Sequence, residues 1–174
     1  MTKILDEVEP EIKRSVSKFD AISVREENAV SLLEPYSKYK PVVAVDPTLL
    51  LDSNDWASIL PPTGAAPKSD YVLGFFIEGN FDHLHATKKF AKQKKMKYVF
   101  VPYSGLSYYQ IGDRCADAGL EDLLELIRNA RYVITDSFHI TVFSIIHRKQ
   151  FYSFMRYREN PVTCLLYTSD AADD

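Results

Sequence analysis

Between residues 71 and 154 the sequence alternates short apolar runs with amphipathic stretches, and this alternation constrains the fold more than any other feature. The pattern predicts strands at 71–77, 98–101, 132–135 and 151–154, separated by helices at 82–95, 120–129 and 138–146. Strands that are apolar on both faces must be covered on both faces, which is typical of a parallel sheet between helices. Because crossovers are right-handed, the sequence predicts an α/β fold with a Rossmann-like, doubly wound parallel sheet.

The residues before 71 predict smaller elements. Residues 1–20 favour a helix, since apolar side chains recur at helical spacing at Ile4, Leu5, Val8, Ile12 and Val16. Short strands are predicted at 21–24 and 41–45, on either side of a helix at 26–33. Another short helix should begin near residue 53, with either Asp52 or Ser53 as its N-cap.

These elements suggest a division into domains. Residues 61–70 contain three prolines, a glycine and small polar residues, so they form a predicted linker. Residues 1–60 are interpreted as the remnant of an N-terminal domain with its connection, and 71–163 as a Rossmann-like C-terminal domain. Residues 164–174, CLLYTSDAADD, resemble the translation of a transposase adapter used in DNA library preparation, and we interpret them as a non-native tail. A natural disordered tail is the alternative.

Composition and charge exclude several classes of function. A net charge of −3 argues against a surface that coats nucleic acid. No apolar run is long enough for a membrane-spanning helix, so stable membrane insertion is not expected. The two cysteines have neither a disulfide framework nor a metal-ligand spacing, and a G-x-G-x-x-G dinucleotide motif is absent. We therefore expect a cytoplasmic protein without a metal or cofactor.

The turn at 135–139, Thr-Asp-Ser-Phe-His, is the best candidate for a ligand site. It joins a predicted strand to a predicted helix, and ligands of open parallel sheets lie beyond such strand ends, near helix N-termini. Ser137 suits the N-cap position, and His139 in the first turn could contact a phosphate or act as a general acid. The alternative is that Asp136 and Ser137 only cap the helix while His139 fills a polar niche.

The sequence around this turn resembles a known family. Residues 119–154 are similar to the polysaccharide pyruvyl transferases, which share a leucine-rich helix followed by a TDSFH turn. Their sequence is GLEDLLELIRNARYVITDSFHITVFSIIHRKQFYSF, in which the glycine precedes the predicted helix. Two upstream segments agree with that family: Ile-Ser-Val-Arg-Glu at 22–26, and Asp-Pro-Thr-Leu-Leu-Leu at 46–51 with Asp55 and Trp56 after it. The resemblance covers residues 19–158.

The resemblance implies two Rossmann-like domains in the GT-B arrangement, of which this chain would hold the C-terminal half. It also implies an enzyme that transfers pyruvate from phosphoenolpyruvate to a pair of sugar hydroxyls in cell-surface polysaccharide biosynthesis, on a polymeric or lipid-linked acceptor at the inner face of the membrane. Arg25 would clamp an anion of the donor, and an ion pair with Glu26 or Glu27 is its structural alternative.

In the same resemblance His139 matches the site histidine and would contact phosphate or donate a proton. Asp136, Ser137 and Phe138 would line the donor site with it. Ile140 stands where the family usually has glycine, which removes room for a close approach of the backbone to the donor.

Three functions remain open from the sequence. The first is pyruvyl transfer; because most of the N-terminal domain is expected to be missing, we hypothesise that this polypeptide alone has no turnover. The second is a GT-B glycosyltransferase that uses a nucleotide sugar, and the third is a non-catalytic ligand-binding relative.

Overall fold

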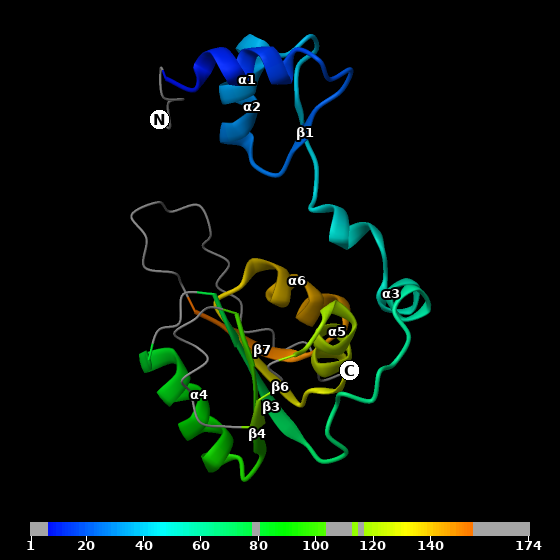
Figure 1. The fold of residues 1–174 in the computed structure, drawn as a ribbon, viewed down its shortest axis with the longest axis vertical. Coiled ribbons are helices and arrows are strands. Elements are labelled where there is room, and N and C mark those ends of the chain that lie inside the picture. The colour runs from blue at the N-terminus through cyan, green and yellow to red at the C-terminus, as the bar shows by residue number, and fades with distance from the viewer. Residues whose placement is uncertain (1–6, 78–80, 104–112, 115–116, 155–174) are drawn as a thin grey trace. The chain divides into compact units, whose positions relative to one another are not determined.

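The computed structural model describes residues 7–77, 81–103, 113–114 and 117–154 (Figure 1). The chain divides into two compact units, Met1–Leu50 and Leu51–Asp174. The proposed tail at 164–174 lies outside the described residues.

The first unit contains two parallel strands with helices around them. Ser23 pairs with Val42 and Val24 with Val43. The helix α1 buries none of its side chains, and among the described residues of this unit Val30 and Pro41 are the two buried apolar residues. The elements are α1 (Glu9–Val16), β1 (Ser23–Val24), α2 (Glu27–Leu33), η1 (Glu34–Tyr36), β2 (Val42–Val43) and η2 (Pro47–Leu50).

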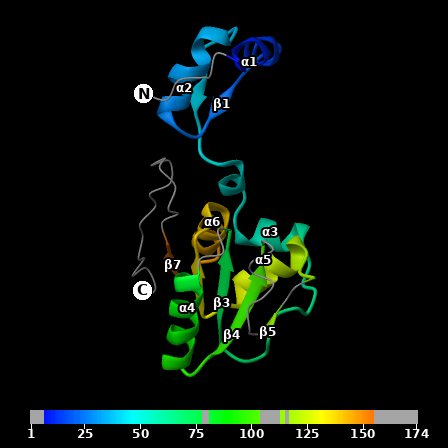
Figure 2. The same ribbon diagram turned by 60° about the vertical axis from the view of Figure 1, so that its left-hand side comes forward.

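The second unit is built on a five-stranded parallel sheet in the order β5-β4-β3-β6-β7 (Figure 2). This arrangement confirms the predicted Rossmann-like α/β fold and adds the very short strand β5, which was not predicted. The elements are α3 (Ser53–Ile59), β3 (Tyr71–Phe76), α4 (Phe81–Gln93), β4 (Lys97–Pro102), β5 (Asp113–Arg114), α5 (Leu120–Asn129), β6 (Tyr132–Thr135), α6 (Phe138–Ile146) and β7 (Gln150–Ser153).

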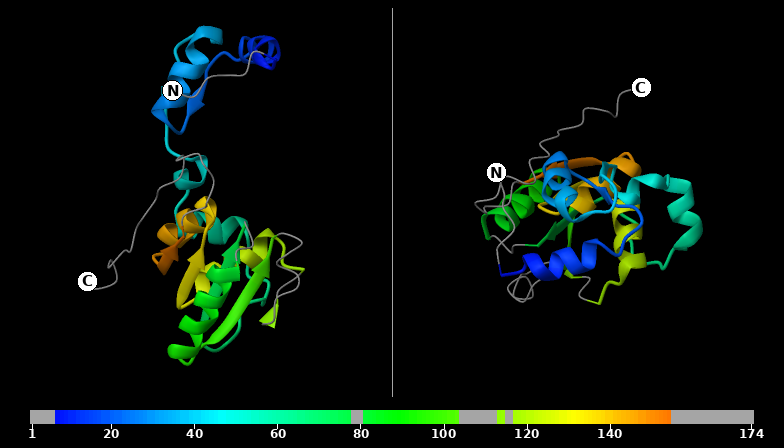
Figure 3. Two further views of the ribbon diagram at one scale, coloured as in Figure 1. Left: turned by 90° about the vertical axis from the view of Figure 1, so that its left-hand side faces the viewer. Right: turned by 90° about the horizontal axis from the view of Figure 1, so that it is seen from above.

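Helices cover both faces of this sheet. Figure 1 shows α4 on one side of the sheet and α5 and α6 on the other, and Figure 3 shows the same layers from two further directions. The two hydrophobic clusters follow these layers: Leu84 and Ala91 of α4 pack on one face, and Leu126 and Phe143 pack on the other. All six residues of β3 are buried, as expected for a central parallel strand. The fully buried Phe76 alone contributes about 1.5–3 kcal/mol of hydrophobic stabilisation.

Two local features of the second unit connect the sequence to the fold. Asp52, rather than Ser53, is the N-cap of α3, because its carboxylate accepts the backbone N–H groups of Asn54 at 2.7 Å and Asp55 at 2.9 Å. The stretch 61–70 has no helix or strand, and it is fastened to α5 by Glu125. That carboxylate accepts backbone N–H groups within this stretch, at residues 63, 64 and 66.

A buried tyrosine provides a test of the packing on the α4 face. Tyr98 lies across Gly74, where an added Cβ would be 2.9 Å from the tyrosine ring and hydroxyl. The Tyr98 hydroxyl is buried without a hydrogen-bond partner in the described part of the chain, and burial raises the pKa of Tyr98. We expect Tyr98→Phe to stabilise the unit by about 1 kcal/mol in urea denaturation, since an unsatisfied buried hydroxyl is removed.

Tyr71→Phe is the matched control for this substitution. The Tyr71 hydroxyl is fully buried but donates a hydrogen bond of 2.6 Å to the Leu126 carbonyl oxygen. Its removal should therefore lower stability by about 1 kcal/mol. A loss of stability in Tyr98→Phe equal to that in Tyr71→Phe would contradict the assignment.

Candidate functional site at the β6–α6 turn

The order of the strands places a switch point between β3 and β6. From β3 the chain moves outward to β4 and β5, and it then returns to place β6 and β7 on the other side of β3 (Figure 2). At such a point consecutive crossovers leave in opposite directions, which opens a crevice beyond the carboxyl ends of the strands. The predicted site turn follows β6 directly, so it lies at this crevice.

Two buried polar side chains join β6 to β3 at the switch point. The Thr135 hydroxyl donates to the Phe75 carbonyl oxygen at 2.7 Å, and one carboxylate oxygen of Asp136 accepts the backbone N–H of Ile77 at 2.7 Å. Asp136 is only 4% exposed. These bonds hold the ends of the two strands together at the crevice, so Asp136 supports the backbone of the candidate site.

Ser137 is the N-cap of α6, as the sequence predicted. Its hydroxyl accepts the backbone N–H of Ile140 at 3.5 Å, and its own N–H donates to the Thr135 hydroxyl at 2.9 Å. Ser137 is 3% exposed, so its main role is to set the direction of the helix. The first N–H groups of any α-helix have no partner within the helix, and together with the helix dipole they favour an anion at this end.

The hydroxyls of Thr141 and Ser153 connect α6 to β7, a contact that the sequence analysis did not predict. The Thr141 hydroxyl lies 3.0 Å from the Ser137 carbonyl oxygen and 3.3 Å from the Ser153 hydroxyl. Thr141 is four residues after the N-cap, and a threonine at this spacing often donates a hydrogen bond to a carbonyl oxygen of its own helix. The sequence therefore held a signal for the bond to Ser137. The contact with Ser153 could not be predicted from local sequence, because it depends on how α6 packs against β7.

The side chains of the first turn of α6 point to different environments. His139 is exposed, Phe138 is half-buried, and their rings meet edge-on with centroids 5.3 Å apart. Ile140 is 3% exposed and belongs to the hydrophobic cluster on the α5–α6 face. The isoleucine side chain is therefore part of the core, while the imidazole is on the exposed side of the turn.

Arg25 lies in the first unit, immediately after β1. Its guanidinium forms an ion pair of 2.7 Å with Asp46, which follows β2. Asp46 is 6% exposed, and its other oxygen accepts the backbone N–H and the hydroxyl of Thr48, at 3.1 and 2.7 Å. An ion pair was one reading of Arg25, but Asp46 is a partner that the sequence analysis did not anticipate. The Arg25 side chain keeps 52% of its surface exposed, so this pairing orients the guanidinium without burying it.

Two further features are absent from the part of the chain that the structure describes. No group of three or more His, Cys, Asp or Glu residues there is arranged to hold a metal ion. No helix among these residues is long and apolar enough to cross a membrane.

Comparison with known proteins identifies the family of this chain. No curated protein matches this chain. The sequence model of the family described as Polysaccharide pyruvyl transferase matches residues 4–157, which is most of the chain and includes both Arg25 and the β6–α6 turn. The chain therefore belongs to the polysaccharide pyruvyl transferase family, as the resemblance of its TDSFH segment indicated.

Proposed function

We propose that this protein takes part in the transfer of pyruvate from phosphoenolpyruvate to two hydroxyls of a saccharide, with the donor bound at the β6–α6 turn. One observation carries the proposal: the exposed imidazole of His139 lies in the first turn of α6, at the switch point of the sheet. Phosphoenolpyruvate carries a phosphate and a carboxylate next to the reacting carbon. A helix N-terminus and a proton donor are the two features that such a donor requires.

The chemistry assigns a role to each residue of the turn. The proton that His139 donates adds to the methylene carbon of the donor, and the neighbouring carbon becomes open to attack by a sugar hydroxyl. The first hydroxyl gives its proton back to His139, and a second hydroxyl displaces phosphate, which carries away the second proton and leaves a pyruvate ketal on the sugar. Phe138 lines the turn beside the imidazole. Asp136 and Ser137, both nearly fully buried, act as positioning residues, because a carboxylate in direct contact would repel an anionic donor.

Arg25 is the proposed anion clamp of the first unit. A guanidinium can bind a carboxylate or phosphate with two parallel hydrogen bonds, and the ion pair with Asp46 holds it in one orientation. The GT-B arrangement, a polymeric or lipid-linked acceptor and a location at the cytoplasmic face of a membrane belong to the same proposal.

Calorimetric titration of the chain with phosphoenolpyruvate tests the proposal. We expect His139→Ala to weaken binding by roughly 10- to 100-fold, since hydrogen bonds to charged groups contribute about 1.5–3 kcal/mol. His85→Ala is the matched control, because His85 is also exposed and lies on α4. Equal binding by both variants would remove His139 from the site. Binding of UDP-glucose in place of phosphoenolpyruvate would favour a nucleotide-sugar glycosyltransferase instead.

A further inference from the structure

A second histidine lies at the carboxyl edge of the five-stranded sheet. His83 is in the first turn of α4, which follows β3 and covers the face of the sheet opposite α5 and α6 (Figure 1). Because β3 and β6 form the switch point, α4 begins at the same edge as the β6–α6 turn. Side chains of an α-helix tilt toward its N-terminus, which directs the His83 imidazole toward the ends of the strands. His83 is therefore on the α4 side of the crevice.

Two aromatic side chains hold the His83 ring in this position. The imidazole lies flat on the Phe154 ring, with centroids 4.1 Å apart and an interplanar angle of 8°, and its centroid is 5.9 Å from that of the Phe76 ring. Phe76 is the last residue of β3. The backbone N–H of Phe154 donates to the Thr135 carbonyl oxygen at the end of β6, at 2.8 Å. The imidazole is thus packed at the ends of both strands of the switch point.

The two nitrogens of the imidazole have different surroundings. Nδ1 of His83 is buried and has no hydrogen-bond partner. The side chain forms no hydrogen bond within the part of the chain that the structure describes, and Nε2 is not buried, so Nε2 is open to solvent. Orphaned buried N–H groups are rarer in folded proteins than orphaned acceptors, which favours the tautomer with its proton on Nε2. His83 therefore presents an unpaired N–H donor at the crevice.

Packing alone does not account for a histidine at this position. Phenylalanine would fill the space beside Phe76 and Phe154 without burying an unpaired nitrogen, and such a buried atom destabilises the fold. The Tyr98 hydroxyl is also buried without a partner, but its side chain has no second polar atom that reaches solvent. His83 combines a buried unpaired nitrogen with an open donor at the edge where ligands of this fold bind.

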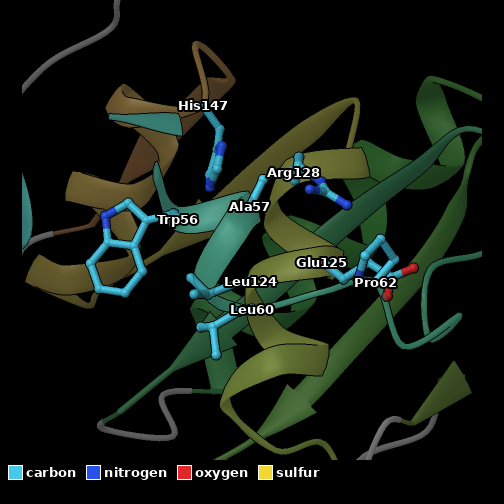
Figure 4. A pocket seen from close by; sticks show the side chains of 8 residues that line it. All are labelled: Trp56, Ala57, Leu60, Pro62, Leu124, Glu125, Arg128 and His147. Atoms are coloured by element: carbon cyan, nitrogen blue, oxygen red, sulfur yellow. The ribbon is translucent and has the colours of Figure 1, made fainter. Parts of the chain in front are cut away.

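A cleft between α3 and α5 in the same unit does not provide an alternative place for a ligand. Its lining includes Trp56, Leu124 and Arg128 (Figure 4), and its volume is about 10 Å³. This is room for about one water molecule. The Glu125 carboxylate also lines the cleft and would repel an anion. An anionic ligand larger than water is therefore expected at the carboxyl edge and not in this cleft.

We propose that His83 binds the donor from the α4 side of the crevice, where its Nε2–H donates a hydrogen bond to an anionic oxygen. Phosphoenolpyruvate carries two anionic groups, a phosphate and a carboxylate. The N-terminal end of α4 favours negative charge at the same place as this N–H. The two anions are then held from two helices, α4 and α6. The identity of the ligand as phosphoenolpyruvate rests on the proposed function, whereas the unpaired imidazole and its position do not.

The variant His83→Phe tests this proposal, because it keeps an aromatic ring on Phe154 and removes the N–H donor. We expect His83→Phe to melt at a higher temperature than the unmodified protein and yet to bind phosphoenolpyruvate about tenfold more weakly in calorimetric titration. His83→Gln keeps a side-chain N–H donor and should bind more tightly than His83→Phe. His85→Phe is the matched control, since His85 is exposed on the same helix, and its binding should be unchanged.

A comparison of two pH values separates a neutral donor from a charged one. A neutral imidazole still donates from Nε2 in mild base, so the difference in affinity between the unmodified protein and His83→Phe should persist at pH 8.5. A difference that is present at pH 6 and absent at pH 8.5 would mean that His83 acts as a cation, and the proposed tautomer would be wrong. Equal binding by His83→Phe and the unmodified protein would overturn the proposal as a whole.

Titration with inorganic phosphate distinguishes a failure of this proposal from a failure of the proposed function. Phosphate binding that His83→Phe weakens, in a protein that does not bind phosphoenolpyruvate, would keep the anion contact at His83 and contradict the proposed function. Phosphoenolpyruvate binding that depends on His139 and not on His83 would contradict this proposal alone. If neither ligand bound to the unmodified protein, both proposals would fall.

Discussion

Replacement of Asp136 by alanine is expected to destabilise the second unit by about 2–3 kcal/mol and to weaken donor binding at the same time. The substitution removes the carboxylate that accepts the Ile77 N–H at 2.7 Å and leaves that amide without this acceptor at the end of β3. Hydrogen bonds to charged groups contribute about 1.5–3 kcal/mol, and a buried amide left unsatisfied carries the full cost of its lost hydration. Urea denaturation and calorimetric titration with phosphoenolpyruvate measure the two effects.

Asp136→Asn is the informative comparison. The asparagine side chain keeps a carbonyl oxygen that can accept the Ile77 N–H, but it lacks the negative charge. If Asp136 acts by positioning the strand ends, asparagine should restore most of the stability and most of the donor binding. If the carboxylate instead acted on the donor through its charge, Asp136→Asn would bind the donor differently from the unmodified protein even though its stability was restored.

The β6–α6 turn could be predicted because its signals are local. An apolar run ending in a threonine, a serine at the N-cap position and a helical pattern after it are sufficient to specify strand, turn and helix. The parallel sheet was predictable for a similar reason, since strands without polar alternation must be covered on both faces. The position of His139 in the first turn of the helix was predicted in the same way, and its role in a site remains a proposal.

The remaining contacts could not be predicted because they join residues that are distant in sequence. The Ile77–Asp136 hydrogen bond spans 59 residues, and the Arg25–Asp46 ion pair spans 21. No local pattern shows which acid will meet a given arginine across two parallel strands. Strand β5 has only two residues, Asp113 and Arg114, and so few residues carry no periodicity. The position of Ile140 in the core likewise depends on how α6 sits on the sheet.

Replacement of Glu125 by alanine should destabilise the second unit by about 2–4 kcal/mol, because one buried carboxylate holds much of the stretch 61–70. One of its oxygens accepts the N–H groups of Thr63 at 2.5 Å and Gly64 at 2.9 Å and the Thr63 hydroxyl at 3.0 Å; the other accepts the Ala66 N–H at 3.4 Å. Denaturation of the variant and faster proteolysis within 61–70 would show the loss. Glu121→Ala is the control, since Glu121 is exposed on the same helix.

The effect of Glu125 should also depend on pH in one direction. Burial raises the pKa of Glu125, but the hydrogen bonds from Thr63, Gly64 and Ala66 outweigh it and hold the pKa below its ordinary value of 4.5. A carboxyl whose pKa is lower in the folded state binds protons more readily in the unfolded state. The contribution of Glu125 to stability is therefore present above pH 4.5 and is lost as the pH falls through the pKa of the folded state. The stability difference between the unmodified protein and Glu125→Ala should therefore stay constant near neutral pH and shrink in acid. A difference that grew on acidification would mean that the carboxyl is held in its protonated form, and the account of how residues 61–70 are fastened would be wrong.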